Sequence, residues 1–379
     1  MTFANWSYPT DIKFGEGRIR ELESICKSCK IDRPLFVTDP VLLESQMTQK
    51  TLKRIRSKFS CEVFSDIDSN PTEKNLMLGI NVFKSGKHDG VIAFGGGSSL
   101  DIGKLIAFMT PQSRSVWDFE DVDDWWKRAE ESKICPIIAV PTTSGTGSEV
   151  GRASVLTNSM TKEKKIIFHP KILPSAVICD PILTTSMPKN ITAGTGLDAL
   201  AHCIEAYCSP AFHPMSNGIA LEGIKLVKEN LLLAYNNGSD IFARSNMMSA
   251  ALMGAVAFQK GLGAVHALSH PIGAIYNTHH GLTNGVLLPY VLKFNFKKIQ
   301  RKINNLSSYL NIKNGFDGFL SFVEDLNTSL DVPHGLSELG VLEKDMDRII
   351  EGALKDPSQA SNPIKLNTKN LAAILTSAM

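Results

Sequence analysis

Hydrophobic positions follow different patterns in the two halves of the chain. In the first half, short apolar runs alternate with segments whose apolar residues recur at helical spacing. Strands are predicted over residues 34–39, 61–64, 88–94, 134–140 and 176–179. Strands that alternate with helices are typical of a mostly parallel sheet covered by helices, so this half is predicted to be α/β and Rossmann-like.

Strand patterns disappear from Pro188 onward, and apolar residues then recur at helical spacing to the C-terminus. We therefore expect two domains, an α/β domain over 1–185 and an all-helical domain over 186–379. The acidic and aromatic stretch 117–128 is predicted to be a surface excursion from the first domain.

Composition changes this interpretation little. The chain has 379 residues, which is long enough for two separate cores, and a formal net charge of +2 that indicates neither nucleic acid nor a membrane as a partner. No apolar run approaches the length of a membrane span, and the N-terminus lacks the pattern of a signal peptide. Cys26 and Cys29 form a C-x-x-C without a second pair, which favours two incidental thiols over a zinc or redox site and suits a reduced cytoplasm.

Histidines gather in one apolar segment of the second half. Four of the nine histidines lie between Val265 and Pro289, and His266 and His270 are spaced to share a helix face. Asp198 and His202 repeat that spacing on another apolar segment. Buried imidazoles must be hydrogen-bonded or bound to a metal, so these pairs need an explanation.

One oxygen and three nitrogens would come from Asp198, His202, His266 and His280. Such a donor set suits Fe(II) or Zn(II) better than magnesium or calcium. The alternative for each residue alone is a helix-capping aspartate or an ordinary core histidine.

Two features of the first half suit a dinucleotide. Gly96, Gly97 and Ser98 lie between a predicted strand and a helix N-terminus, where free N–H groups and the helix dipole favour a pyrophosphate; the alternative is a plain tight turn. Asp39 ends the first strand, where a carboxylate accepts ribose hydroxyls and repels a 2′-phosphate, which favours NAD(H) over NADP(H). The alternative for Asp39 is a cap on the following helix.

The two histidine-bearing stretches carry a family resemblance. They read Gly-Leu-Asp-Ala-Leu-Ala-His and His-Ala-Leu-Ser-His-Pro-Ile-Gly-Ala-Ile-Tyr-Asn-Thr-His-His-Gly-Leu-Thr-Asn. In both, the chain resembles the iron-containing (group III) alcohol dehydrogenases, and the resemblance spans nearly its whole length. The Gly-Gly-Gly-Ser run, with Asp101 and Lys104 after it, matches that family's own loop.

The resemblance implies the dehydroquinate synthase-like fold of iron-type alcohol dehydrogenases, and NAD(H)-linked exchange of hydride with a small alcohol or aldehyde. It implies that Asp198, His202, His266 and His280 bind the metal, with His270 beside it. It also implies a homodimer or larger homo-oligomer. Further cofactor contacts are implied for Asn70, Thr142, Thr143, Thr146 and Lys164. The rival hypotheses are another reaction on this scaffold, as in glycerol-phosphate dehydrogenase or dehydroquinate synthase, and a non-catalytic protein that binds NAD or metal.

Two residues carry separate hypotheses. His270 is the candidate for moving a proton between the substrate oxygen and solvent, and its alternative role is to orient a metal ligand. Lys260 lies in a segment shorter than that of many family members, so it is a candidate for binding an acidic group on the substrate. The alternative for Lys260 is a lysine that reaches into solvent.

Overall fold

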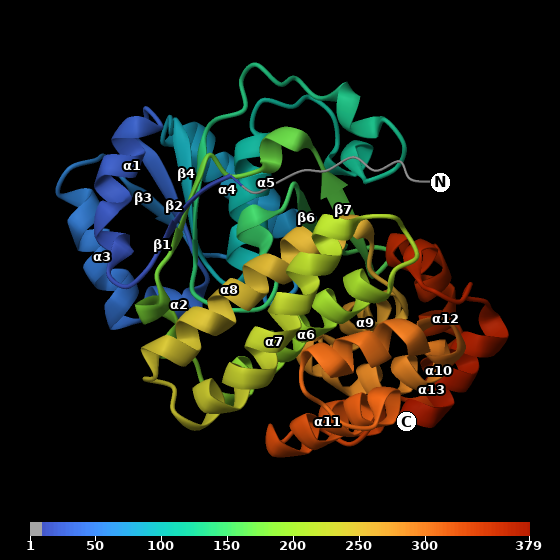
Figure 1. The fold of residues 1–379 in the computed structure, drawn as a ribbon. Coiled ribbons are helices and arrows are strands. Elements are labelled where there is room, and N and C mark those ends of the chain that lie inside the picture. Colours follow the sequence, from blue (N-terminus) through green and yellow to red (C-terminus); the bar gives the residue numbers. More distant parts are fainter. Residues whose placement is uncertain (1–9) are drawn as a thin grey trace. The chain divides into compact units, whose positions relative to one another are not determined.

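The structure of the protein is a computed structural model that describes residues 10–379; the prediction about a signal peptide therefore lies outside the described residues. The described chain divides into two compact units. We call residues 10–143 and 147–185 the α/β unit, and residues 144–146 and 186–379 the helical unit. The predicted architecture, a parallel sheet followed by a mostly helical domain, is confirmed (Figure 1).

The α/β unit is built on a six-stranded sheet in the order β1-β8-β5-β4-β2-β3. Every strand pair in this sheet is parallel. The strands are β1 (Asp11–Phe14), β2 (Pro34–Val37), β3 (Glu62–Phe64), β4 (Gly90–Gly95), β5 (Ile137–Pro141) and β8 (Ala176–Cys179). From β2 the chain proceeds to β3 on one side, whereas β4 lies on its other side, so the sheet has a topological switch point between β2 and β4.

Helices cover both faces of this sheet (Figure 1). Phe36, Ile92 and Ile138 share one face with α1 (Leu22–Ser28) and α3 (Gln46–Arg56). On the other face Gly103 of α5 lies so close to Ala93 that an added Cβ would be 2.6 Å from the alanine Cβ. The remaining helices of this part are α2 (Pro40–Leu43), α4 (Glu73–Ser85) and α5 (Gly97–Met109).

An antiparallel hairpin of β6 (Ala153–Asn158) and β7 (Glu163–Phe168) was not expected from the sequence. Its second strand reads Glu-Lys-Lys-Ile-Ile-Phe and has no alternation of polar and apolar residues that would predict a half-buried strand. The stretch 117–128 does form an excursion, with two short 3₁₀ helices and charged, exposed residues between them.

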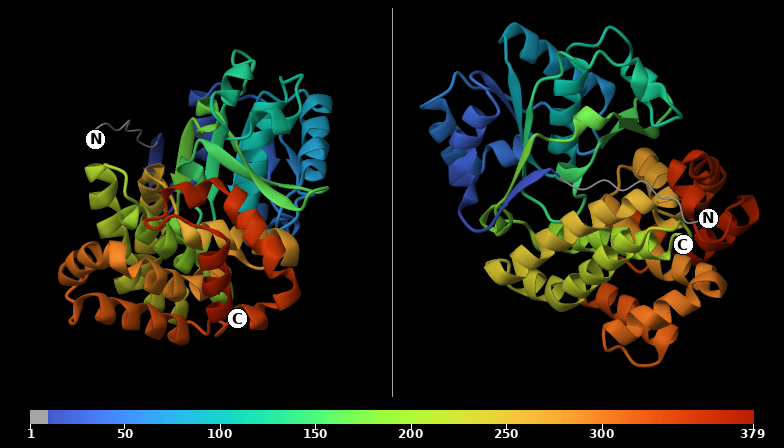
Figure 2. Two further views of the ribbon diagram at one scale, coloured as in Figure 1. Left: turned by 90° about the vertical axis from the view of Figure 1, so that its right-hand side faces the viewer. Right: turned by 45° about the horizontal axis from the view of Figure 1, so that its top comes forward.

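The helical unit surrounds one buried helix, α6 (Lys189–Cys208). Helices α7, α8 and α10 all pack against α6, and Figure 2 shows these helices side by side. The helices after α6 are α7 (Pro214–Asn236), α8 (Ile241–Ala257), α9 (Ala264–Tyr276), α10 (His280–Tyr309), α11 (Gly315–Ser329), α12 (Met346–Lys355) and α13 (Thr368–Ala378). Because α6 is covered on several sides, its polar residues are buried with it.

The expectation that no apolar run approaches the length of a membrane span is wrong for one segment, Ile241–Lys260, which is long and apolar enough by length and composition alone. More than half of its apolar window is buried inside the fold. The core helix of a globular protein has the same properties. All seven cysteines are free, and burial raises the pKa of the Cys26 thiol to about 12, which keeps that thiol protonated. The C-x-x-C pair therefore behaves as two structural thiols.

A close backbone approach between α6 and α10 generates a stability prediction. A Cβ on Gly281 of α10 would overlap the carbonyl oxygen of Gly194 in α6, whereas a Cβ on Gly285 would meet the end of the Leu197 side chain at 2.7 Å. We expect Gly281→Ala to destabilise the protein by roughly 3 kcal/mol, because a backbone must shift, and Gly285→Ala by much less, because a leucine can turn. Thermal unfolding of the two variants measures the difference. Equal losses would show that the α6–α10 contact is not this close.

Candidate metal centre and cofactor loops

Helix α6 brings carboxylates and an imidazole into an apolar interior. Residues 192–208 of this helix are buried almost throughout. Asp198, His202 and Glu205 lie on one face because their spacings of four and three residues match a helical turn. A helix that is buried all round supplies a dry site for any polar group on it.

Two further helix starts supply the other imidazoles. Helix α9 begins after Gly263 and carries His266 and His270 one turn apart. It ends at Asn277 in the left-handed conformation, and the chain then turns into α10. His279 caps α10 by accepting the Leu282 N–H at 3.4 Å, which places His280 in the first helical turn.

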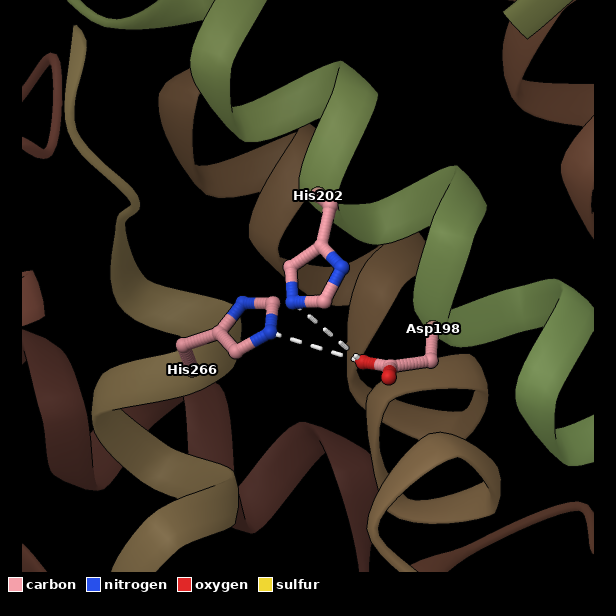
Figure 3. A group of neighbouring side chains, drawn as sticks. All are labelled: Asp198, His202 and His266. Atoms are coloured by element: carbon pink, nitrogen blue, oxygen red, sulfur yellow. Dashed lines mark ion pairs between the residues drawn. The ribbon is translucent and has the colours of Figure 1, made fainter. Parts of the chain in front are cut away.

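The structure brings the four predicted metal ligands together. Nε2 atoms of three imidazoles surround Asp198 Oδ1, at 3.6 Å for His202, 3.6 Å for His266 and 3.5 Å for His280. Figure 3 shows Asp198 and His202 projecting from one helix toward His266 on another. Ligand atoms of Asp198, His202 and His266 all lie within 4.8 Å of one another. His280 is less buried than these three, with a side chain 25% exposed.

These distances match what a tetrahedral cation site requires. With metal–ligand bonds of about 2.0–2.1 Å, neighbouring ligand atoms are about 3.3–3.4 Å apart. The three nitrogen–oxygen distances exceed that edge by only a few tenths of an ångström. One carboxylate oxygen and three imidazole nitrogens are also a donor set that iron and zinc accept, so the residues present fit a divalent metal.

Charges within this cluster are strongly coupled. Burial alone would raise the pKa of Asp198, but His202, His280 and His266 hold it far below its usual range. Burial lowers the pKa of His202 to about 4, against the attraction of Asp198. Burial would also lower the pKa of His266, but Glu205 and Asp198 raise it to about 9. A buried carboxylate among imidazoles thus needs at least one positive charge nearby.

Asn284 of α10 also reaches this cluster. Its Nδ2 donates to Asp198 Oδ1 at 2.9 Å and lies 3.3–3.4 Å from Nε2 of His280 and His266. Its Oδ1 is buried and has no hydrogen-bond partner among residues 10–379. A buried oxygen without a partner, on a side chain whose nitrogen contacts three ligand atoms, is a further sign that a polar group belongs in this site.

Two carboxylates that were not predicted from the sequence contact Nδ1 atoms of the histidines. Glu205 Oε2 lies 2.6 Å from His266 Nδ1, and Asp356 Oδ2 lies 2.7 Å from His270 Nδ1. Glu205 follows His202 at helical spacing, so the sequence contained a signal for it. Asp356 is 86 residues from His270 in the chain, and no local pattern connects the two.

The glycine loop of the α/β unit follows β4 at the switch point. Gly95 has φ +147°, a conformation that a side chain would strain, and Gly96 caps α5 without a side chain of its own. A Cβ on Gly96 would lie 3.3 Å from Thr143, so that loop and the turn after β5 abut. Ser98 Oγ donates to the Ser69 carbonyl at 2.7 Å and thereby fixes the segment that carries Asn70.

Asp101 and Lys104, on the helix after the glycine loop, form hydrogen bonds with residues 148–155. Asp101 accepts hydrogen bonds from Ser148 Oγ at 2.5 Å and from Val155 N–H at 3.0 Å. The buried Lys104 ammonium donates to the carbonyls of Ser148 and Ala153 at 2.9 and 2.5 Å. Both residues therefore connect α5 to the segment that follows the Thr142–Ser148 turn.

The other predicted cofactor residues lie as follows. Asp39 caps α2, because its Oδ1 accepts the Leu42 N–H at 2.8 Å. The helix-cap role expected as the alternative is therefore present, and it uses one of the two carboxylate oxygens. Thr142 and Thr143 follow β5 in the α/β unit, whereas Thr146 belongs with the helical unit. Lys164 lies on β7, and the adjacent Lys165 is engaged by Glu120 and Glu163 at 3.5 and 3.1 Å.

Lys260 does not reach into solvent, so that alternative is wrong. Its side chain is buried, and its ammonium donates to the carbonyls of Ala206 and Tyr207 and to Asn217 Oδ1, at 2.9, 3.0 and 2.7 Å. An ammonium group has three N–H bonds, and these three acceptors use them all. The lysine donates to the C-terminal carbonyls of α6, and burial, together with the neighbouring Lys302, lowers its pKa to about 7. The geometry gives no support to Lys260 as a binder of acidic substrates.

Comparisons with known proteins agree with this arrangement. Residues 9–181 match the model of the iron-containing alcohol dehydrogenases, and residues 192–379 match the C-terminal model of the same family. The chain is 37% identical over 382 residues to a 4-hydroxybutyrate dehydrogenase of Cupriavidus necator, covering 98% of this chain and 99% of that protein. It is 32% identical over 384 residues to an NAD-dependent methanol dehydrogenase of Bacillus methanolicus, covering 99% and 100%. A crystal structure of 1,3-propanediol oxidoreductase superposes with a TM-score of 0.94 at 33% identity over the full length of both chains.

The place of Lys260 at the end of α6 can be tested. Lys260→Met removes the lysine donor from Ala206 O and Asn217 Oδ1 and leaves Tyr207 O with Lys302 alone, so we expect a loss of about 1–3 kcal/mol in the free energy of unfolding. It should not change the ratio of kcat/KM between an acidic alcohol and a neutral alcohol of similar size. Lys297→Met, on the exposed side of α10, is the matched control and should change neither quantity. A selective loss on the acidic alcohol would restore the substrate-binding hypothesis.

Proposed function

The chain belongs to the iron-containing (group III) alcohol dehydrogenase family, and we propose that it transfers hydride between a small alcohol or aldehyde and NAD(H) at a metal held in its helical unit. The observation that carries the proposal is the convergence of three imidazole nitrogens on Asp198 Oδ1 at 3.5–3.6 Å. A cation site of this kind is what an alcohol oxidation needs beside a nicotinamide.

Asp198, His202, His266 and His280 would hold the metal, with Fe(II) as the expected ion and Zn(II) as the alternative. When bound, such a cation acts as a Lewis acid toward a hydroxyl or carbonyl oxygen. The protein's own contribution is to keep these donors dry and fixed on three helix segments. A preorganised polar site in a dry interior stabilises developing charge more than water does.

His270 is the residue we propose for moving the substrate proton. Its Nδ1 is held by Asp356, and its ring stacks on His280 with centroids 5.3 Å apart. The remaining nitrogen, Nε2, is then the atom available to accept or return a proton. In the oxidation, bound NAD would take up the hydride, and His270 Nε2 would take up the hydroxyl proton of the alcohol.

For the cofactor we propose binding at the carboxyl ends of β2, β4 and β5. There the first-turn N–H groups of α5, at Gly96, Gly97 and Ser98, suit the pyrophosphate. The second oxygen of Asp39 would accept from the adenosine ribose. The remaining contacts that we propose are made by Asn70, Thr142, Thr143, Thr146 and Lys164. The carboxylate of Asp39 disfavours a 2′-phosphate, so NAD(H) is the expected cofactor.

We propose a primary or small functionalised alcohol, acidic or neutral, as the substrate. The relatives support both types, since one is named for 4-hydroxybutyrate and another for methanol. A homodimer or larger homo-oligomer is proposed from the family resemblance. A cytoplasmic location is proposed because all seven cysteines are unpaired, as in a reducing compartment.

Anaerobic purification, metal analysis and an NADH assay test the function. With Fe(II) or Zn(II), we expect turnover of at least one among 4-hydroxybutyrate, methanol, 1,3-propanediol and their aldehydes. Asp198→Asn should lower kcat/KM by roughly 100-fold or more, because the only anionic donor is lost. Asp317→Asn makes the same change on the exposed start of α11 and should have no effect. Metal binding without any net NADH turnover would contradict the proposal and favour a synthase-type reaction or a binding protein.

Asp39→Asn separates the two roles of Asp39. Asparagine caps a helix as well as aspartate does, so α2 and the melting temperature should be unchanged. Removing the charge should cut the preference of kcat/KM for NADH over NADPH by about tenfold or more, since repulsion of the 2′-phosphate is lost. If the preference stays the same, Asp39 is a helix cap only.

A further inference from the structure

Glu205 is a buried carboxylate with two partners on the same neighbouring helix. It lies on α6, seven residues after Asp198, and its side chain is 5% exposed. Oε2 lies 2.6 Å from His266 Nδ1, and Oε1 accepts the Val265 N–H at 2.7 Å. One residue of α6 thus holds both the backbone and the imidazole at the start of α9.

The first N–H groups of α9 are not capped by a side chain at the N-cap position. Gly263 occupies the N-cap position and has no side chain to satisfy the first N–H groups. Glu205 accepts from Val265 N–H, and Asn362 Oδ1 accepts from Ala264 N–H at 3.1 Å. A Cβ at Gly263 would lie 2.9 Å from both acceptor oxygens, so only glycine leaves them room.

The carboxylate also decides which nitrogen of His266 carries a proton. A carboxylate accepts but does not donate, so the short contact places a hydrogen on Nδ1. In the neutral ring that a metal ligand requires, Nε2, on the opposite side, then keeps its lone pair, and it is Nε2 that faces Asp198 Oδ1 at 3.6 Å. By contrast, His202 Nδ1 has no hydrogen-bond partner of this kind among the described residues.

We propose that Glu205 is the positioning residue of the metal centre: it fixes His266 in the tautomer that can bind a cation through Nε2, and it couples α6 to α9 at the ligand. The inference rests on the proposed metal site. It goes beyond that site by naming a residue that touches neither substrate nor cofactor and acts through His266. A partner of this kind orients the ring and raises its basicity as a ligand.

Glu205→Gln is the sharpest variant, because the two side chains have the same shape. The glutamine oxygen can still accept from Val265 N–H, and that contact directs its amide NH₂ toward His266 Nδ1. The imidazole must then accept at Nδ1 and carry its proton on Nε2, where the metal would bind. We expect the affinity of the apoprotein for Zn(II) to fall by roughly 10- to 100-fold, the usual cost of losing such a partner.

Competition with a chromophoric chelator measures the Zn(II) affinity, and thermal unfolding of the apoprotein measures the fold. Asn362→Ala is the matched control, because it removes the other acceptor at the start of α9 without touching His266. It should lower the melting temperature while the Zn(II) affinity stays close to that of the unchanged chain. Equal losses of affinity in both variants would show that Glu205 acts only as a helix cap.

A second measurement needs no variant. In the Zn(II)-loaded protein with ¹⁵N-labelled histidine, His266 should show a proton on Nδ1 that exchanges slowly and resonates far downfield. An unprotonated Nδ1 on His266 would overturn the proposal even if Glu205→Gln fails to fold. If the unchanged chain binds no Zn(II) at all, the proposed metal site itself is wrong. If the unchanged chain binds Zn(II) tightly and Glu205→Gln binds it equally well, only the proposed positioning role of Glu205 is wrong.

Discussion

The helical unit depends on one carboxylate surrounded by three imidazoles in an apolar interior. Asp198 is buried, and without a cation its charge is balanced mainly by the proton on His266, whose pKa Glu205 and Asp198 raise to about 9. Removing such groups from water costs several kcal/mol each, and only a well-placed opposite charge offsets that cost. A divalent cation meets this need with one ion. The core of this part of the protein is therefore arranged for a metal before any substrate is considered.

That constraint accounts for several features that look unrelated. The helices must approach closely enough for their side chains to share one ion, which requires glycine where α10 starts against α6. Helix α9 begins without its own cap because a carboxylate from α6 takes that place. The end of α6 is held by Lys260 and by Lys302, whose ammonium donates to the carbonyls of residues 207–209. Each feature fixes the helix that carries Asp198 and His202.

The sequence predicted those parts of the fold and site that local spacing determines. Alternating strand and helix patterns gave the parallel sheet, and i, i+4 spacing placed Asp198 with His202 on one face and His266 with His270 on another. The partner of His270 could not be predicted, because Asp356 lies 86 residues away in the chain and no periodicity records that contact. Glu205, the partner of His266, was missed although it follows His202 at helical spacing. The β6–β7 hairpin was missed because polar and apolar residues do not alternate along its second strand, β7. The burial of Lys260 was not predicted, because the sequence does not distinguish a lysine that donates to the C-terminal carbonyls of another helix from a lysine on the surface.

The hydrogen bonds of Lys260 bear on which residues can select the substrate. Relatives named for an acidic hydroxy acid and for methanol align with this chain over nearly its full length. In this chain, Lys260 and Lys302 are both directed to backbone carbonyls at the end of α6. Neither ammonium has a hydrogen bond to spare for a carboxylate, since each already donates to three acceptors. These lysines therefore fix the end of α6, and the choice between acidic and neutral alcohols must depend on other residues.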